Sequence, residues 1–174
     1  MIVIRLTNSD GSVVSAVPTT TTAAGQGFFE VQSISFSTEQ TLNIGAASSG
    51  AGAGKITFNP FSFTMPSGSL DAIMFTMQAS GQAFKTMEVQ IIHAPSPGPT
   101  TPASETFNMK LVAVKTISWS ADASGSNTQF SLEYGSLVVA APSGATGAGT
   151  GKTIIGGWNK VSNQADLTPV TKLA

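Results

Sequence analysis

The chain has 174 residues, of which 41% are hydrophobic and only 10% are charged, and it contains no cysteine. This length suits one domain with a substantial core, so we expect residues 1–174 to form a single domain. The missing cysteines exclude disulfides and cysteine-based zinc sites or nucleophiles. The net charge of −1 gives no basic surface for nucleic acid, and no apolar run is long enough to insert into a membrane.

The N-terminal residues predict a strand from Ile2 to Thr7, because apolar side chains recur at every second position. The turn-forming cluster Asn8–Gly11 closes it. The segment before this cluster lacks the apolar core of a usual signal peptide, so we expect no cleaved signal. After a short second piece at Ser12–Val17, we expect the polar segment Pro18–Gln26 to be an extended linker.

A second strand is predicted from Phe28 to Phe36. The parity of its apolar residues changes near Ser33, which indicates a β-bulge. Bulges of this kind allow a sheet to curl. Leu42 and Ile44 continue the strand pattern before the composition changes abruptly.

The residues from Gly45 to Gly54 are all Gly, Ala or Ser, and Lys55 ends the run. Such a segment buries too little to hold a conformation by itself. We interpret residues 45–55 as an extended arm that a neighbouring subunit orders, and the alternative is an ordinary flexible hairpin loop. The contact residues of this arm would be Ala46, Ala47, Ser48, Ser49, Gly50, Ala51, Gly52, Ala53, Gly54 and Lys55.

The arm runs directly into the alternating segment Ile56–Met65. Its parity slips by one residue at Asn59-Pro60, which predicts another bulge. A helix is expected next, where Ser67 or Ser69 would cap the first turn and Gly81 would supply the left-handed stop. Its apolar stripe, at spacings of three and four residues, consists of Leu70, Ile73, Met74 and Met77.

Alternating patterns predict further strands in the second half of the chain, at Met87–His93, Phe107–Trp119, Phe130–Ala141 and Lys152–Lys160. Proline-rich and glycine-rich loops separate them, and we expect residues 164–174 to form a loose tail. Roughly six to eight strands with one helix, and no regular alternation of strands and helices, predict a mainly β protein. The expected architecture is a small antiparallel β-barrel with one flanking α-helix.

The sequence contains few residues or motifs that are typical of catalytic sites. The segment GAGTGKT, from Gly147 to Thr153, has the wrong glycine spacing for a phosphate-binding loop and precedes a strand-like sequence instead of a helix. His93 is the only histidine, so a metal cluster would need an all-oxygen ligand set. We therefore predict neither a cofactor nor an enzyme activity. Trp119 and Trp158 are interpreted as buried or interface anchors. Their alternative role is a pair of platforms in a carbohydrate-binding β module.

The order of segments resembles a known family. A glycine-rich arm ends in GAGAGK and leads into the strand ITFNPFSFT. The helix LDAIMFTMQASG, the strand MEVQIIHA, the long segments ETFNMKLVAVKTISWSADA and NTQFSLEYGSLVVAA, and finally Gly157-Trp158-Asn159 follow. Across about Ile2–Asn163, this order is similar to the haemolysin-coregulated protein (Hcp) family, the tube proteins of bacterial type VI secretion systems.

The resemblance implies that six copies form a ring and that rings stack into a hollow tube. The arm residues Ala46–Lys55 would contact a neighbouring ring, and Trp158 would anchor a packing or subunit contact. Sheath, spike and effector proteins would be further partners. The chain would be made in the bacterial cytoplasm and exported as part of the tube. The alternative is a related extracellular filament or phage-like injection tube built from the same ring.

Overall fold

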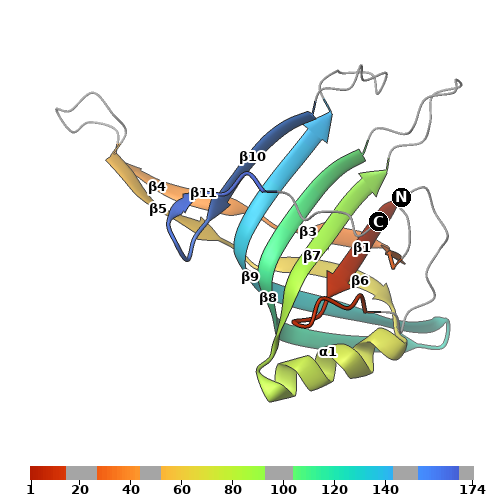
Figure 1. The fold of residues 1–174 in the computed structure, drawn as a ribbon. Helices are drawn as coiled ribbons and strands as arrows, with labels where there is room; N and C mark the ends of the chain where they lie inside the picture. The colour runs from red at the N-terminus through yellow and green to blue at the C-terminus, as the bar shows by residue number, and fades with distance from the viewer. Residues whose placement is uncertain (15–26, 44–51, 93–103, 143–152, 169–174) are drawn as a thin grey trace, which may run out of the picture.

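The computed structural model describes residues 1–14, 27–43, 52–92, 104–142 and 153–168, which form eleven strands and one helix (Figure 1). The strands are β1 (Ile2–Thr7), β2 (Phe29–Val31), β3 (Ser33–Ser35), β4 (Thr38–Asn43), β5 (Gly52–Phe58), β6 (Phe61–Pro66), β7 (Ala83–Ile92), β8 (Ser104–Asp122), β9 (Gly125–Pro142), β10 (Thr153–Asn159) and β11 (Gln164–Ala165). The helix α1 covers Ser69–Ser80. The mainly β class with one helix is confirmed.

Nine strands form one curled antiparallel sheet. Along it, neighbours follow the order β11-β10-β9-β8-β7-β1-β2, and β6 pairs with both β3 and β9. The segment β2–β3 changes partner at Gln32, whose amide donates to the carbonyl of Thr64 over 2.8 Å. The small antiparallel barrel expected from the sequence corresponds to this curled sheet. The sheet curls, but no continuous ladder of paired strands closes it, because β2 and β3 are short pieces bonded to different strands.

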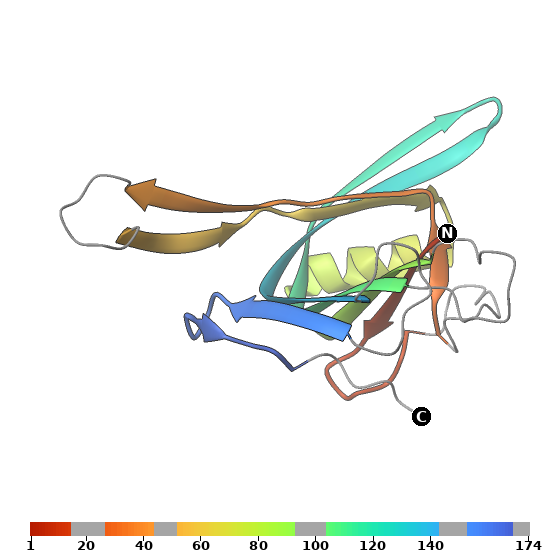
Figure 2. The same cartoon turned by 90° about the horizontal axis from the view of Figure 1, so that it is seen from above.

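The strands β8 and β9 are the longest in the sheet and pair with each other. They pair almost throughout, and their hairpin turns between Asp122 and Gly125. The register shifts between Val114 and Thr116, so the alternation expected for one long strand is interrupted there. In the view from above, the far half of this hairpin projects past α1 (Figure 2).

The main core lies inside the curl. Phenylalanines dominate it, and Phe63 contacts the rings of Phe29, Phe61 and Phe130 at centroid distances of 4.9–6.3 Å. Burial of these apolar side chains is the main driving force for the fold. The parity predicted across Asn59-Pro60 is confirmed, since Phe58, Phe61 and Phe63 are all buried.

Helix α1 covers part of the core with the predicted stripe. Leu70 and Met74 are buried, and Ile73 and Met77 pack against the same cluster. Gly81 adopts a left-handed conformation with φ 67°, and its amide donates to the carbonyl of Gln78, as expected for a helix stop. The expected serine cap is wrong. Gly68, which has no side chain, occupies the N-cap position, and Ser67 bonds Thr128 instead.

The opposite face of the sheet is also covered. Val3, Phe28 and Ile92 form a small second cluster there. Beside it, Arg5 forms an ion pair with Glu88 of the neighbouring strand, and both side chains are less than a tenth exposed. Alternation in β1 and β7 therefore separates two buried faces, one apolar and one with both apolar and charged side chains.

Candidate assembly surface

Strand β5, which holds the described part of the predicted arm, pairs with β4 in a hairpin that extends away from the rest of the chain. Strands β4 and β5 pair as a separate two-stranded sheet, from Thr38 opposite Phe58 to Asn43 opposite Gly52. Figure 2 shows this hairpin projecting to one side. Of the predicted contact residues, Gly52–Lys55 belong to β5, and 46–51 lie outside the described residues.

Asn59 fixes the base of the hairpin. Its side-chain amide donates to Ser37 Oγ and to Glu39 Oε1, each over 2.8 Å, and its backbone amide donates to the Ser37 carbonyl over 3.0 Å. The predicted bulge at Asn59-Pro60 is thus the point where the chain leaves the hairpin and enters the main sheet. The change of parity marks this point in the sequence, but the role of Asn59 has no sequence signal.

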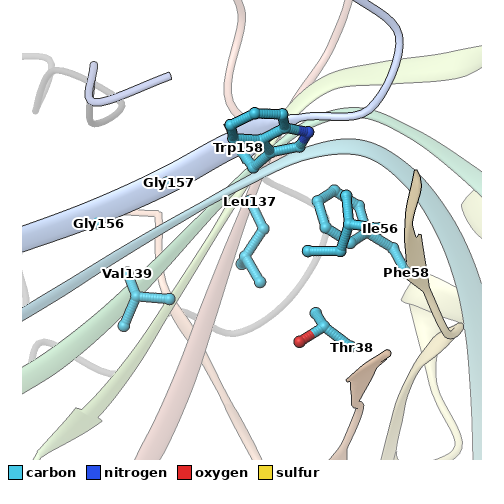
Figure 3. Close-up of a pocket in the computed structure, with 8 residues that line it drawn as sticks. All are labelled: Thr38, Ile56, Phe58, Leu137, Val139, Gly156, Gly157 and Trp158. Atoms are coloured by element: carbon cyan, nitrogen blue, oxygen red, sulfur yellow. The ribbon is translucent and has the colours of Figure 1, made fainter. Parts of the chain in front are cut away.

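A pocket of ≈ 270 Å³ lies between the base of the hairpin and the strands β9 and β10 (Figure 3). It is lined by Thr38, Ile56, Phe58, Leu137, Val139, Gly156, Gly157 and Trp158. Except for Thr38, the lining is apolar or glycine. A Cβ atom on Gly156 would meet no atom within 4 Å, so the missing side chain at this position leaves part of the pocket open.

Trp158 forms one wall of this pocket and is partly buried against the core. It lies opposite Leu137 of β9, which also lines the pocket (Figure 3). Its indole Nε1 atom is buried and has no hydrogen-bond partner among the described residues. Sequence reasoning places Trp158 in the core or at a subunit contact, and in the structure it lies at the edge of the core.

We expect Trp158→Ala to lower the free energy of unfolding by about 2 kcal/mol, less than the 3–5 kcal/mol typical of a fully buried aromatic residue. Trp158→Phe should cost less than about 1 kcal/mol, because it keeps most of the ring and removes the unpaired donor. Urea unfolding of both variants measures the difference. Equal losses for the two would show that the ring contacts contribute little.

A stack of Phe58 on Tyr134 lies behind the pocket, with ring centroids 5.3 Å apart. The ammonium of Lys160 lies 5.7 Å and 5.9 Å from the two ring centroids, within range of a cation–π contact. Burial, and then the charge of Glu133, raise the pKa of Tyr134 to about 12. The phenol is therefore neutral at physiological pH, and its ring packs against Phe58 at the base of the hairpin.

Strand β10 carries the most exposed apolar side chains next to the pocket. Ile154 is 64% exposed and Ile155 is 39% exposed. On the side away from β9, the only described strand that pairs with β10 is β11, and it reaches no further than Trp158. An apolar strand with an unpaired edge favours association with another strand.

The two tryptophans do not form a common platform. Trp119 pairs with Thr128, whereas Trp158 pairs with Leu137, nine residues further along β9. At about 3.3 Å per residue, this separation along the strand is roughly 30 Å. Trp119 is 56% exposed, so of its two expected roles, buried anchor or interface anchor, it is not a buried anchor in the single chain. A sugar site that uses both rings at once is inconsistent with this arrangement.

Other candidate chemistry is limited. Among the described residues, no group of three or more His, Asp or Glu side chains could hold a metal ion. His93 lies outside these residues, and so does most of Gly147–Thr153, whose last residue begins the strand β10. In the part of the chain that the structure describes, no helix has the length and hydropathy required to cross a membrane.

Comparison with protein families gives one match, to the model described as "Type VI secretion system effector, Hcp", over residues 19–140. No curated protein sequence matches the chain. Among solved structures, a type six secretion system protein aligns with a TM-score of 0.74 at 16% identity, over 95% of this chain and 98% of that one. Hcp1 from E. coli EAEC 042 has a TM-score of 0.70 at 15% identity, with 91% and 97% covered. Hcp1 from Salmonella typhimurium has a TM-score of 0.68 at 16% identity, with 95% and 99% covered.

Proposed function

The chain belongs to the Hcp family of type VI secretion proteins and is a structural tube protomer, and we propose that six copies form each ring of its tube. The observation that supports this proposal is that several features without a partner in the single chain lie together on one side of it. There, an unpaired strand edge, two exposed isoleucines and an apolar pocket lie next to the base of a projecting hairpin.

A closed ring requires a heterologous contact, in which one surface of each copy meets a different surface of the next. The side formed by β10 and the pocket supplies one of these surfaces. Because only 10% of the residues are charged, little charge must be removed from water when copies pack together. The unpaired backbone groups of β10 add hydrogen bonds that a monomer leaves to water.

The hairpin β4–β5 serves contacts between rings. Its outer residues, Ala46–Lys55, have small side chains that allow close backbone approach, apart from the terminal lysine. The ordering of each such residue costs about 1–2 kcal/mol in backbone entropy, which main-chain hydrogen bonds to an adjacent ring would offset in part. Asn59 and its two side-chain partners direct the hairpin away from the curled sheet.

The remaining partners follow from the role of a tube. Sheath and spike proteins would contact the assembled tube from outside and at its tip, and effectors would travel in its lumen. The chain would be made in the bacterial cytoplasm and would leave the cell as part of the tube. We propose no catalytic role for it.

Deletion of Ala46–Ala53 is expected to leave rings intact and to abolish their stacking. The paired base of the hairpin and the Asn59 contacts remain in this variant, so the curled sheet keeps its support. Electron microscopy in negative stain measures both ring formation and tube length. The matched control keeps the eight positions but changes their order, which preserves length and composition.

If the deletion variant forms tubes as long as those of the unchanged protein, the hairpin is an ordinary loop. If it forms no rings, the hairpin contributes to the contact within a ring instead of the contact between rings. A control variant that also loses stacking would show that the order of these residues matters in addition to their number.

A further inference from the structure

The segment after β10 turns back and covers one end of that strand. We define residues 159–168 as the C-terminal clip. The side chain of Asn159 accepts hydrogen bonds from the amides of Val161 (2.9 Å) and Ser162 (3.1 Å), and Asn163 takes a positive φ of 55°. This turn returns the chain as β11, which pairs with Trp158 and Asn159. The expectation of a loose tail from residue 164 is therefore wrong for Gln164 and Ala165, which pair as β11.

Asp166 holds the clip in place with its backbone and its side chain. Its amide donates to the carbonyl of Gly157 over 3.2 Å. Its carboxylate accepts a hydrogen bond from Lys110 Nζ of β8 over 2.9 Å, and another from the amide of Thr168 over 3.1 Å. The bond from Lys110 is the largest cause that lowers the pKa of Asp166 below its usual value of 3.8. The ion pair is therefore formed at neutral pH and is lost only in acid.

Two glycines of the neighbouring strands make room for the clip. A Cβ atom on Gly157 would collide with the carbonyl oxygen of Asp166. A Cβ atom on Gly135 would lie 3.3 Å from Cγ2 of Val161, and the carbonyl of Gly135 accepts a hydrogen bond from the amide of Lys160 over 3.0 Å. The clip thus fits a surface that is shaped for it, which distinguishes it from a chance contact.

The clip divides the outer edge of β10 into a covered part and an open part. In an antiparallel pair, the backbone groups of alternate residues point to opposite sides of the strand. The carbonyl of Gly157 points away from β9, toward the clip, so the backbone groups of Ile155 and Thr153 point in the same direction. Among the described residues, no strand pairs with this open part of the edge.

We propose that the clip is a stop for strand pairing between copies, so that a strand of a second copy adds to β10 upstream of Gly157 and ends against the clip. This inference rests on the proposed ring and names what fixes the register of its contact. Edge strands pair readily in wrong registers unless something blocks them. A slip of two residues would keep the same side chains facing inward and would displace the neighbour by about 7 Å. Such a displacement changes the angle between copies and prevents uniform closure.

The decisive variant is Asp166→Pro in the full chain. Proline removes the amide that donates to Gly157 and the carboxylate that binds Lys110, and the length of the chain is unchanged. Asp166→Asn is the milder second variant, and the same outcomes decide the test for it. The matched control is Lys115→Gln, which breaks an ion pair with Glu133 (2.8 Å) and leaves in place the longer contact of Glu133 with Lys160 of the clip (3.8 Å).

Two measurements are needed for each protein. Hydrogen exchange across residues 158–168 shows whether the clip is open, and negative-stain images show the distribution of ring sizes. We expect one ring size for the unchanged chain and for Lys115→Gln. For Asp166→Pro, we expect loss of exchange protection in the clip and a mixture of ring sizes, open chains or irregular aggregates.

If a variant whose clip is open forms uniform rings, the proposed role of the clip as a stop is wrong, and the proposed ring is unaffected. Mixed assemblies from Lys115→Gln would also overturn it, because they would result from the loss of any ion pair. If the unchanged chain forms no rings, the proposed function fails, and the stop fails with it. If Asp166→Pro does not fold, the same outcomes are read from Asp166→Asn.

Discussion

Glu88→Gln is expected to destabilise the fold by about 3–5 kcal/mol, the range found when one partner of a buried ion pair is removed. Glu88 contacts Arg5 Nη2 through one carboxylate oxygen and accepts a hydrogen bond from Gln90 Nε2 (2.7 Å) through the other. The side chains of the pair are 7% and 4% exposed. Glutamine keeps the shape but leaves the guanidinium buried without a counter-charge, over the ring of Phe28 (4.7 Å from its Cζ to the centroid).

Urea unfolding of Glu88→Gln measures this loss. The control is Glu133→Gln, which removes a carboxylate that is 40% exposed and should cost no more than about 1 kcal/mol. The double variant Arg5→Met with Glu88→Leu should recover much of the stability, because apolar residues of similar volume often replace a buried pair without loss. A loss below about 1 kcal/mol for Glu88→Gln would mean that water reaches the pair.

Gly156→Leu is expected to abolish ring formation and to leave the protomer folded. A Cβ at this position meets no atom within 4 Å, so the side chain enters the pocket between β10 and the base of the hairpin without strain. A neighbouring copy that seats against this pocket would then be excluded. Light scattering after size exclusion measures the change in mass, and circular dichroism checks the fold.

The control for the pocket variant is Ser118→Leu, which adds the same side chain at an exposed position of the β8–β9 hairpin. It should assemble like the unchanged chain. Assembly of Gly156→Leu at the normal mass would place the contact between copies elsewhere, and the pocket would then have no role in the ring.

Local patterns identified most strands, because alternation of apolar residues is a direct consequence of a half-buried sheet. Ile2–Thr7 is a strand at the predicted bounds, and the parity change near Ser33 corresponds to the change of partner at Gln32. These features depend on neighbours in the sequence. The end of the helix at Gly81 was predictable for the same reason, because the left-handed conformation that ends the helix depends on the backbone of that residue alone.

Features set by distant residues were not predicted. Glu88 and Gln90 lie opposite the apolar face of β7, and nothing in the strand itself shows that both faces are covered. The pairing of Gln164 and Ala165 with β10 likewise depends on Asp166 and Lys110, which are 56 residues apart. The candidate surface was found only in part. The sequence identified the arm and Trp158, but the pocket beside them requires the hairpin and β10 to be placed in space.

The most direct test of the tube assignment is the mass of the purified full-length chain, measured by light scattering and followed by negative-stain imaging of the same sample. The expected result is a species of about six times 17.7 kDa or larger, seen as rings with a central hole or as stacks of them. A single 17.7 kDa species at micromolar concentration, with no rings on the grid, would contradict it.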